Sequence, residues 1–314
     1  MVITVTLNPA VDKTLEVPDL EVGVHARARL LAVVPAGKGV NVARGLARLG
    51  AAAIACGFVG RSEQAAYGTS LEADGVACAL CPVDGVTRTN TTILDPVRRT
   101  TTHLREQGFT VNVDDVARLR ARVTEAVLRY RGEPCGATVA FSGSLPPGLG
   151  LAEWVALLRA TAEAEGITVV DTSGEALRAA VDSGVVNTVK PNLLELGQCL
   201  GEEVRLPDAP SRAARLLDRV ETVLLTLGPH GAYAVRRGLC VGMACRIDPA
   251  QVRNTVGCGD AFLAGWLYGW SRSGDVRDAL RWAVAAGAAS ARTETAVGYT
   301  RQEVERLLLR CEPI

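Results

Sequence analysis

Four consecutive residues of this chain combine a glycine turn with an acid: Gly257, Cys258, Gly259 and Asp260. An apolar helical pattern begins directly after them, at Phe262, Leu263, Trp266, Leu267 and Trp270. A glycine turn that enters a helix leaves backbone N–H groups unpaired and directs them, with the helix dipole, at one point. That point suits an anion with several oxygens, such as a phosphoryl group.

A carboxylate beside an anion-binding turn repels the anion, so its presence needs a chemical reason. Removing a proton from an attacking hydroxyl is such a reason, because phosphoryl transfer otherwise requires little beyond positioning and charge neutralisation. We therefore predict that Asp260 is a catalytic base and that the N–H groups of Gly257, Cys258 and Gly259 hold the developing negative charge. The alternative is that Asp260 only caps the helix.

The charge balance and the cysteine content exclude several classes of protein. Among 314 residues, Lys plus Arg and Asp plus Glu number 34 each, so no net field favours nucleic acid or an anionic membrane as a partner. Nine scattered cysteines, with no signal peptide ahead of them, indicate reduced thiols in the cytoplasm. No P-loop sequence is present, and Phe262 stands where a dinucleotide-binding fingerprint needs its third glycine.

Apolar strands and amphipathic helices alternate along most of the chain. Strands are predicted at residues 2–7, 54–59, 138–142, 167–171, 186–190 and 222–226. Helices are predicted at residues 40–49, 110–131, 151–165, 175–183, 193–200, 211–219 and 277–292. This alternation predicts an α/β fold with a mostly parallel sheet, helices on both faces, and ligands at the carboxyl ends of the strands.

Two separated segments of the chain, about 12–35 and 84–107, have sequence patterns that predict strands and no helices. Strands are expected there at residues 30–34, 89–94 and 100–104, with no convincing helix between them. The two pieces predict a small second sheet beside the main one, so that residues 1–314 form a single domain with an appended sheet. The alternative is an ordinary antiparallel hairpin at the edge of the main sheet.

Motifs along nearly the whole chain resemble those of the PfkB/ribokinase family of sugar kinases. Residues 254–262 are similar to its C-terminal signature, with Cys258 in place of the usual alanine, and residues 36–43 are similar to its N-terminal signature. Further similar motifs stand at residues 87–90, 142–148, 171–174, 190–195 and 226–232. The resemblance implies a ribokinase-like doubly wound sheet, with the small sheet acting as a lid over the sugar. A lid suits a kinase because excluding water prevents wasteful hydrolysis of ATP.

The resemblance also implies which residues bind the substrate. The family's counterparts fall on Asp12, Gly37, Lys38, Asn41 and Arg88, and less closely on Arg27. Asp12, in what the sequence suggests is a turn that ends a strand, would accept hydrogen bonds from sugar hydroxyls. Lys38, in a glycine-rich turn, would offer an ammonium to a phosphate, and Arg88 would bind a phosphate with two hydrogen bonds.

For the nucleotide, the resemblance points to Lys190, Asn192, Thr226, Gly228 and Gly231. The two glycines lie in a loop after a strand and permit close backbone approach to ribose and phosphate. Glu195 stands three residues after Asn192 and matches an element that the family links with Mg²⁺, through water. The alternative for Glu195 is an acid that stabilises the start of its own helix.

Taken together, the motifs are most similar to the phosphosugar branch of the family. They imply ATP-dependent phosphorylation of a ketohexose phosphate, with fructose 1-phosphate first, tagatose 6-phosphate second and fructose 6-phosphate third. A catalytically inactive member that senses a sugar phosphate is the alternative outside this class, and the intact Asp260 and glycine turn argue against it. The resemblance also implies a dimer through the lid in many members, and the sequence leaves monomer and dimer open.

Overall fold

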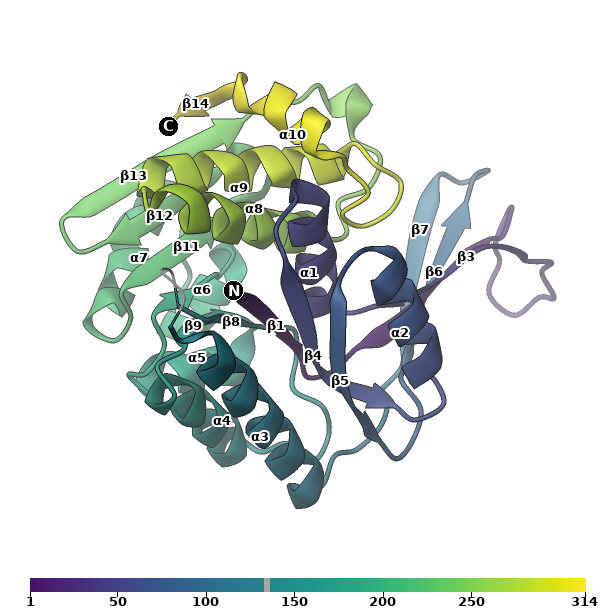
Figure 1. Cartoon of the computed structure of the whole chain (residues 1–314). Coiled ribbons are helices and arrows are strands. Elements are labelled where there is room, and N and C mark those ends of the chain that lie inside the picture. Colours follow the sequence, from purple (N-terminus) through teal and green to yellow (C-terminus); the bar gives the residue numbers. More distant parts are fainter. Residues whose placement is uncertain (133–135) are drawn as a thin grey trace.

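A sheet of ten strands forms the centre of the molecule in the computed structural model, which describes residues 1–132 and 136–314 (Figure 1). The strand order is β14-β13-β12-β11-β10-β9-β8-β1-β4-β5. Seven strands run parallel, and the strands from β12 to β14 join the β11 side in antiparallel pairs. The predicted α/β class with a mostly parallel sheet is therefore confirmed.

The strands of this sheet are short and largely buried. The parallel strands are β1 (Val2–Thr6), β4 (Ala53–Gly60), β5 (Ala77–Val83), β8 (Thr138–Ser142), β9 (Ile167–Asp171), β10 (Thr188–Val189) and β11 (Thr222–Thr226). The antiparallel ones are β12 (Ala232–Arg236), β13 (Leu239–Cys245) and β14 (Cys311–Pro313). β1 lies inside the sheet, between β8 and β4, and all five of its residues are buried, as expected for a strand that is covered on both faces.

Helices cover both faces of the sheet and form a hydrophobic core with each (Figure 1). One face carries α1 (Lys38–Leu49), α2 (Gln64–Ala73), α8 (Cys258–Ser273), α9 (Val276–Ala291) and α10 (Arg301–Leu308). The other carries α3 (Val113–Tyr130), α4 (Leu151–Glu163), α5 (Gly174–Asp182), α6 (Leu193–Leu200) and α7 (Ala209–Ala214). The helix predicted at residues 211–219 instead ends as a tighter 3₁₀ turn over Arg215–Asp218, as helix ends often do.

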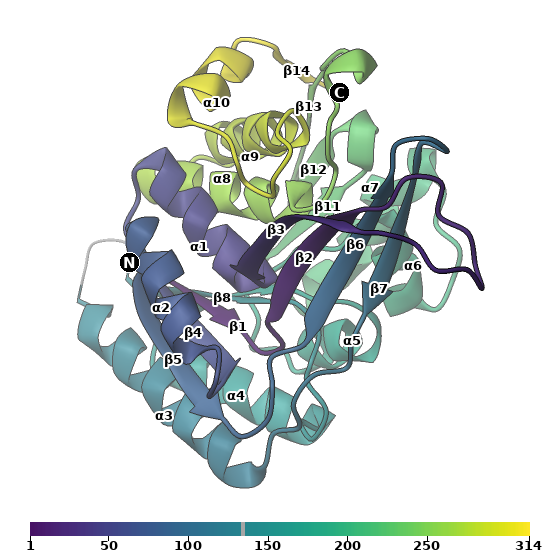
Figure 2. The same ribbon diagram turned by 90° about the vertical axis from the view of Figure 1, so that its right-hand side faces the viewer.

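A second sheet of four strands projects from one edge of this body (Figure 2). Its order is β3-β2-β6-β7, with the strands β2 (Ala10–Glu16), β3 (Arg29–Ala36), β6 (Thr89–Asp95) and β7 (Thr100–Arg105). The small second sheet is therefore confirmed, and it is not a hairpin on the main sheet. The treatment of residues 1–314 as one domain that this small sheet closes as a lid remains our prediction.

One local expectation was wrong. Asp12 does not lie in a turn that ends a strand, because the turn is already complete at residues 7–9 and β2 begins at Ala10. β2 then pairs with β3 on one side and with β6 on the other, so Asp12 lies between two neighbouring strands.

Within the described part of the chain, no helix has the length and apolar character needed to cross a membrane.

Candidate active site

The glycine turn that the sequence predicts to bind an anion lies at the start of α8. Gly257 has φ 81°, in the left-handed region, and a Cβ atom there would lie 2.6 Å from the side chain of Ala296. Neither Gly257 nor Gly259 donates its backbone N–H to another described residue. These two N–H groups are therefore available to an anion at the positive end of the helix dipole.

Asp260 lies in the first turn of α8, only 5 % exposed, at the base of this turn. The side-chain amide of Asn41, on α1, donates to Asp260 Oδ2 at 2.8 Å. Burial raises the pKa of Asp260 from 3.8 to about 7, against the opposing effects of Lys38, Asn41 and Lys190. A carboxylate whose pKa lies near neutral pH is suited to accept a proton and release it again.

A second buried carboxylate, Asp171 at the end of β9, ties two lysines to this site. Lys190 Nζ lies 3.2 Å and Lys38 Nζ 3.3 Å from the same oxygen, Asp171 Oδ1. Although burial raises the pKa of Asp171, the two ammonium groups outweigh it and lower that pKa. Asp171 in turn is the main cause of the raised pKa of Lys38. The negative charges of two carboxylates and the positive charges of two lysines thus offset one another before any phosphate binds.

The two lysines differ in what they can reach. The side chain of Lys190 is 5 % exposed, and a Cβ atom on Gly259 would lie 3.5 Å from its Nζ, so its ammonium borders the anion-binding turn. The side chain of Lys38 is 43 % exposed and can swing toward a ligand. Lys190 therefore has a fixed place in the site, whereas Lys38 is free to follow a bound phosphate.

Elements far apart in the chain bring these groups together. Lys190 follows β10 and Asp171 ends β9, so both stand at the carboxyl edge of the parallel sheet, where such folds bind ligands. Lys38 does not lie in a turn, as the sequence suggested, but begins α1, one turn ahead of Asn41. The Thr6 hydroxyl, at the end of β1, accepts a hydrogen bond from the Val40 N–H at 2.9 Å and fixes the start of that helix.

On the small sheet, Asp12 belongs to a row of polar side chains that crosses three strands. Asp12 on β2 is opposite Asn90 on β6, and Asn90 is opposite Arg105 on β7. Asn90 Nδ2 donates to Asp12 Oδ1 at 3.1 Å. Burial raises the pKa of Asp12, and the charges of Arg88 and Arg105 partly oppose this.

Arg88 links this row to the main sheet. Its guanidinium donates to the backbone oxygens of Pro9 at 3.2 Å and Asn8 at 3.0 Å, in the turn between β1 and β2. Its pKa is lowered by burial and then by the nearby charge of Arg105. Two guanidinium groups that repel each other beside a single carboxylate form a site that an anion would stabilise.

The residues predicted to bind a nucleotide lie together past the ends of β10 and β11. Asn192 and Thr226 pair in an isolated parallel bridge, and the Thr226 N–H donates to the Pro191 oxygen at 3.0 Å. Gly228 has φ 57° and open space where a side chain would lie. A Cβ atom on Gly231 would lie 2.4 Å from the Met243 oxygen, so packing alone already requires glycine there.

Glu195 is engaged in its own helix, as the alternative interpretation proposed. Its Oε2 accepts from the Asn192 N–H at 2.8 Å and its N–H donates to Asn192 Oδ1 at 2.9 Å, which completes a capping box. Its Oε1 has no hydrogen bond to another described residue, and its charge contributes to the raised pKa of Lys38. Mg²⁺ keeps several waters and takes few protein ligands, so this free oxygen fits a water-mediated ion held mainly by nucleotide phosphates. In the described ranges no three His, Cys, Asp or Glu side chains gather as a protein-only metal site.

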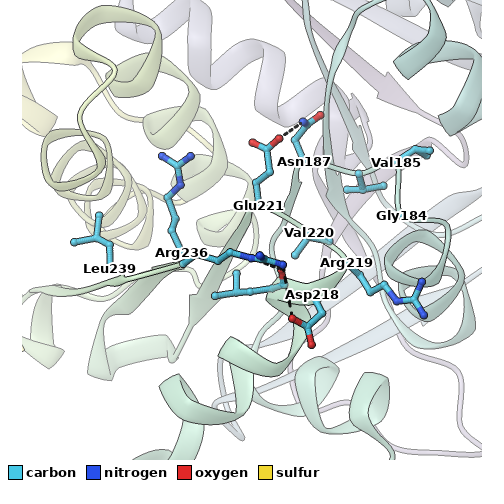
Figure 3. A pocket seen from close by; sticks show the side chains of 12 residues that line it. Gly184, Val185, Asn187, Asp218, Arg219, Val220, Glu221, Arg236 and Leu239 are labelled. Atoms are coloured by element: carbon cyan, nitrogen blue, oxygen red, sulfur yellow. Dashed lines mark hydrogen bonds and ion pairs between the residues drawn. The ribbon is translucent and has the colours of Figure 1, made fainter.

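Two features lie outside this arrangement. Arg27 is in the exposed connection between β2 and β3, and among the described residues no hydrogen bond or ion pair joins it to the other candidates. A groove of about 550 Å³ opens at the amino ends of β10 and β11, the opposite edge of the sheet (Figure 3). Asn187 and Glu221, which line it, bond to each other at 3.0 Å, and no candidate residue lines it.

The sequence reasoning missed three residues that the structure adds to the site: Asp171, Asn90 and Arg105. The sequence places Asp171 in a motif and at the end of a strand, at the same sheet edge as Lys190, but assigns it no role in binding. Asn90 stands in the motif at residues 87–90, but only the register of β2, β6 and β7 shows that it meets Asp12 and that Arg105 lies in the same row. The assembled site brings together a buried carboxylate, a glycine turn, two lysines and, on the small sheet, a second pair of cations beside Asp12 and Asn90.

Comparison with known proteins supports a single family. A family model described as "pfkB family carbohydrate kinase" matches residues 2–300. The 1-phosphofructokinase of Rhodobacter capsulatus is 35 % identical over 286 residues, which are 90 % of this chain and 87 % of that protein. The structure of phosphofructokinase-2 from Escherichia coli with substrates and products has a TM-score of 0.89 at 27 % identity, covering 98 % of both chains. Ribokinase from Arabidopsis thaliana, at 21 % identity and a TM-score of 0.75 over 98 % of both chains, shares the fold.

Proposed function

Because the chain belongs to the pfkB family of carbohydrate kinases and is an ATP-dependent phosphotransferase acting on an alcohol group, we propose that it phosphorylates fructose 1-phosphate to fructose 1,6-bisphosphate. The observation that carries the mechanism is the buried Asp260, with a pKa near 7, beside the unpaired N–H groups of Gly257 and Gly259. The proposed base and the N–H groups that would bind the phosphoryl group thus lie within one turn of the same helix. Tagatose 6-phosphate and fructose 6-phosphate are the alternative substrates.

In this proposal Asp260 accepts the proton of the sugar hydroxyl while that oxygen attacks the γ-phosphorus of ATP. The bond from the phosphorus to the bridging oxygen breaks, and ADP leaves with that electron pair. The N–H groups of Gly257 and Gly259 would hold the charge on the transferred group, whereas the predicted contribution of Cys258 is weakened because its N–H already donates to the Thr255 oxygen at 3.4 Å. Asn41 keeps the carboxylate of Asp260 oriented through its hydrogen bond at 2.8 Å.

Lys190 and Lys38 would neutralise the phosphates as charge moves from the γ-phosphate to ADP. The shared carboxylate of Asp171 keeps both ammonium groups in place when no nucleotide is bound. When bound near Glu195, Mg²⁺ supplies further charge neutralisation on the phosphate oxygens. The nucleotide itself would lie over Asn192, Thr226 and the open backbone of Gly228, with Gly231 shaping the loop.

The sugar would lie between the main sheet and the row on the small sheet. Asp12 can accept hydrogen bonds from two hydroxyls, and Gly37, where a Cβ atom would lie 2.7 Å from Thr6 Cγ2, would let the backbone lie close to them. Arg88 and Arg105 supply the positive charge for the phosphate that the substrate already carries. Two cations beside one carboxylate favour a phosphosugar over an uncharged sugar, and this supports the phosphosugar branch.

The test is release of ADP by the purified protein with Mg-ATP, compared as kcat/KM for fructose 1-phosphate, tagatose 6-phosphate, fructose 6-phosphate, fructose and ribose. We expect a preference of about a hundredfold or more for fructose 1-phosphate, a difference of about 3 kcal/mol in transition-state binding. A preference for a 6-phosphate would move the substrate assignment to an alternative and leave the mechanism intact. No ADP release with any of the five sugars, with ATP still bound, would overturn the enzyme assignment in favour of a sensor.

We also propose that two copies pair through the small sheet. Its face opposite Asp12 exposes apolar side chains, among them Val33 at 53 % and Leu104 at 55 %, and its outer strands β3 and β7 have unpaired edges. Light scattering that finds only monomers at about 10 μM would contradict this pairing.

The described cysteines are free thiols, which supports a reducing compartment such as the cytoplasm.

A further inference from the structure

Two cysteines face each other across the last pair of strands of the large sheet. Cys245, the final residue of β13, is opposite Cys311, the first residue of β14. The Ile314 N–H donates to the Gly242 oxygen at 3.3 Å, which marks that opposite pair as hydrogen-bonded. Because such pairs alternate along an antiparallel ladder, three residues further on the pair of Cys245 and Cys311 is a non-hydrogen-bonded one.

This position has the geometry that a disulfide needs. In a non-hydrogen-bonded pair the Cα atoms lie about 4.5 Å apart and the side chains lie closer than elsewhere in the ladder. A disulfide spans Cα separations of about 4.4 to 6.8 Å. Both sulfurs also lie within hydrogen-bond distance of the Leu307 oxygen, Cys245 at 3.5 Å and Cys311 at 3.3 Å, and so approach the same point, while Cys311 also lies 3.7 Å from the Arg281 oxygen.

A basic groove borders the pair. It has a volume of about 420 Å³ and is lined by Arg292, Glu303, Arg306, Leu307, Leu309 and Arg310. Three guanidinium groups against one carboxylate make it attractive to an anionic molecule. Cys245 and Cys311 are both partly exposed beside it. Leu307 connects the two features, since it is one of the residues that line the groove and its backbone oxygen lies within hydrogen-bond distance of both sulfurs.

The two thiols are unequal in acidity. The pKa of Cys245 is lowered, first by a hydrogen bond from Cys311 and then by the charges of Arg310 and Arg292, which outweigh its partial burial. The pKa of Cys311 is raised, first by the same hydrogen bond, in which it keeps its proton. The pair therefore loses its first proton from Cys245, and a thiolate is the form that attacks a disulfide.

We propose that Cys245 and Cys311 form a reversible disulfide by exchange with a small anionic disulfide, of the glutathione class, that binds in the basic groove. The Cys245 thiolate attacks one sulfur of that molecule, its S–S bond breaks, and one thiolate leaves. Cys311 then gives its proton to water and attacks the Cys245 sulfur of the mixed disulfide, which releases the second thiolate. The two cysteines lose two electrons in total, and the small disulfide is reduced to two thiols.

The bridge would enclose a large and functionally central part of the chain. The segment between the two cysteines contains the anion-binding turn, Asp260, α8, α9 and α10. Closing so long a segment removes conformational freedom from the unfolded chain and stabilises the folded one. The disulfide would therefore lock the edge of the sheet from which the chain runs into the anion-binding turn.

The experiment treats the full-length protein with oxidised glutathione at low salt and maps its cysteines by peptide mass spectrometry without reduction. We expect a Cys245–Cys311 linked peptide about 2 Da lighter than the two thiol peptides together. We also expect a rise in Tm of about 5 °C that dithiothreitol reverses. The cationic disulfide cystamine should react at least about threefold more slowly, and Arg306→Gln should reduce this difference.

Serine variants separate the order of steps from mere proximity. Cys311→Ser should accumulate one glutathione on Cys245, whereas Cys245→Ser should leave Cys311 unmodified. Cys240→Ser, which removes an exposed cysteine of the same strand, is the matched control and should form the bridge as the natural chain does. Glutathione found only on the exposed Cys78 and Cys240, with Cys245 and Cys311 still reduced, would overturn the proposal.

Discussion

Replacing Asp260 by asparagine should remove most of the turnover and also change how the stability of the protein depends on pH. Asparagine has the same size and can still bond to Asn41, so the change removes the ionisable group and little else. Loss of a general base costs at least about a hundredfold in kcat. ATP and the sugar should still bind, since the N–H groups and the cations remain.

The magnitude of the stability effect follows from the raised pKa. The carboxyl group of Asp260 has a pKa of about 7 in the folded protein against 3.8 in an ordinary setting. The folded state therefore binds more protons than the unfolded state between these values, and stability falls as pH rises through that window. Between pH 5.5 and the folded-state pKa of about 7 lie about 1.5 pH units, over which the folded protein holds a proton that the unfolded chain has lost. The free energy of unfolding therefore falls by ~2 kcal/mol between pH 5.5 and pH 8.5.

The variant has no such group, so its stability relative to the natural chain should rise by ~2 kcal/mol between pH 5.5 and 8.5. Urea unfolding of both proteins at the two pH values measures this difference. Asp218→Asn, at a carboxylate whose side chain is 92 % exposed, is the matched control and should show no such trend. If the free energies of unfolding of the variant and the natural chain differ by the same amount at both pH values, the inference that Asp260 is a buried base with a pKa near 7 is refuted.

The same pKa predicts the pH profile of the reaction. Only the ionised form of Asp260 can accept a proton, and the ionised fraction rises from about one tenth at pH 6 to about nine tenths at pH 8 when the pKa is near 7. We expect kcat/KM for the sugar to rise about tenfold over this range. A flat profile, or near-normal kcat in Asp260→Asn, would remove Asp260 from the mechanism.

Three further variants test the phosphate sites. Arg88→Ala should raise KM for the phosphosugar at least about tenfold more than KM for ATP, and equal effects on both would mean that the sugar phosphate lies elsewhere. Gly259→Ala should leave Tm unchanged or slightly higher, because its Cβ meets only Lys190 Nζ at 3.5 Å, yet lower kcat at least about tenfold by crowding the phosphoryl group. Gly257→Ala, whose Cβ would lie 2.6 Å from Ala296, should instead lower Tm, and equal Tm values for the two variants would contradict this reasoning.

The features that could be predicted from the sequence are those that depend only on residues close together in the chain. The start of α8 is one of them, because a glycine turn, an acid and an apolar helical pattern follow one another directly. The alternation of strands and helices is another, since each element shows its own period and the alternation itself favours a parallel sheet. The family motifs add Lys38, Asn41 and Lys190, each of which the structure places around Asp260 or Asp171.

The remaining features depend on which distant segments become neighbours. Nothing local in the sequence shows that Asp171 holds two lysines on one oxygen, because the three residues come from β9, from the end of β10 and from the start of α1. Arg105 joins Asp12 only through the register of three strands, and a shift of one residue would turn it to the other face. Cys245 and Cys311 meet for the same reason, as opposite members of one ladder. The types of the chemical groups are therefore readable from the chain, whereas their partners and pKa values arise only when folding buries them together.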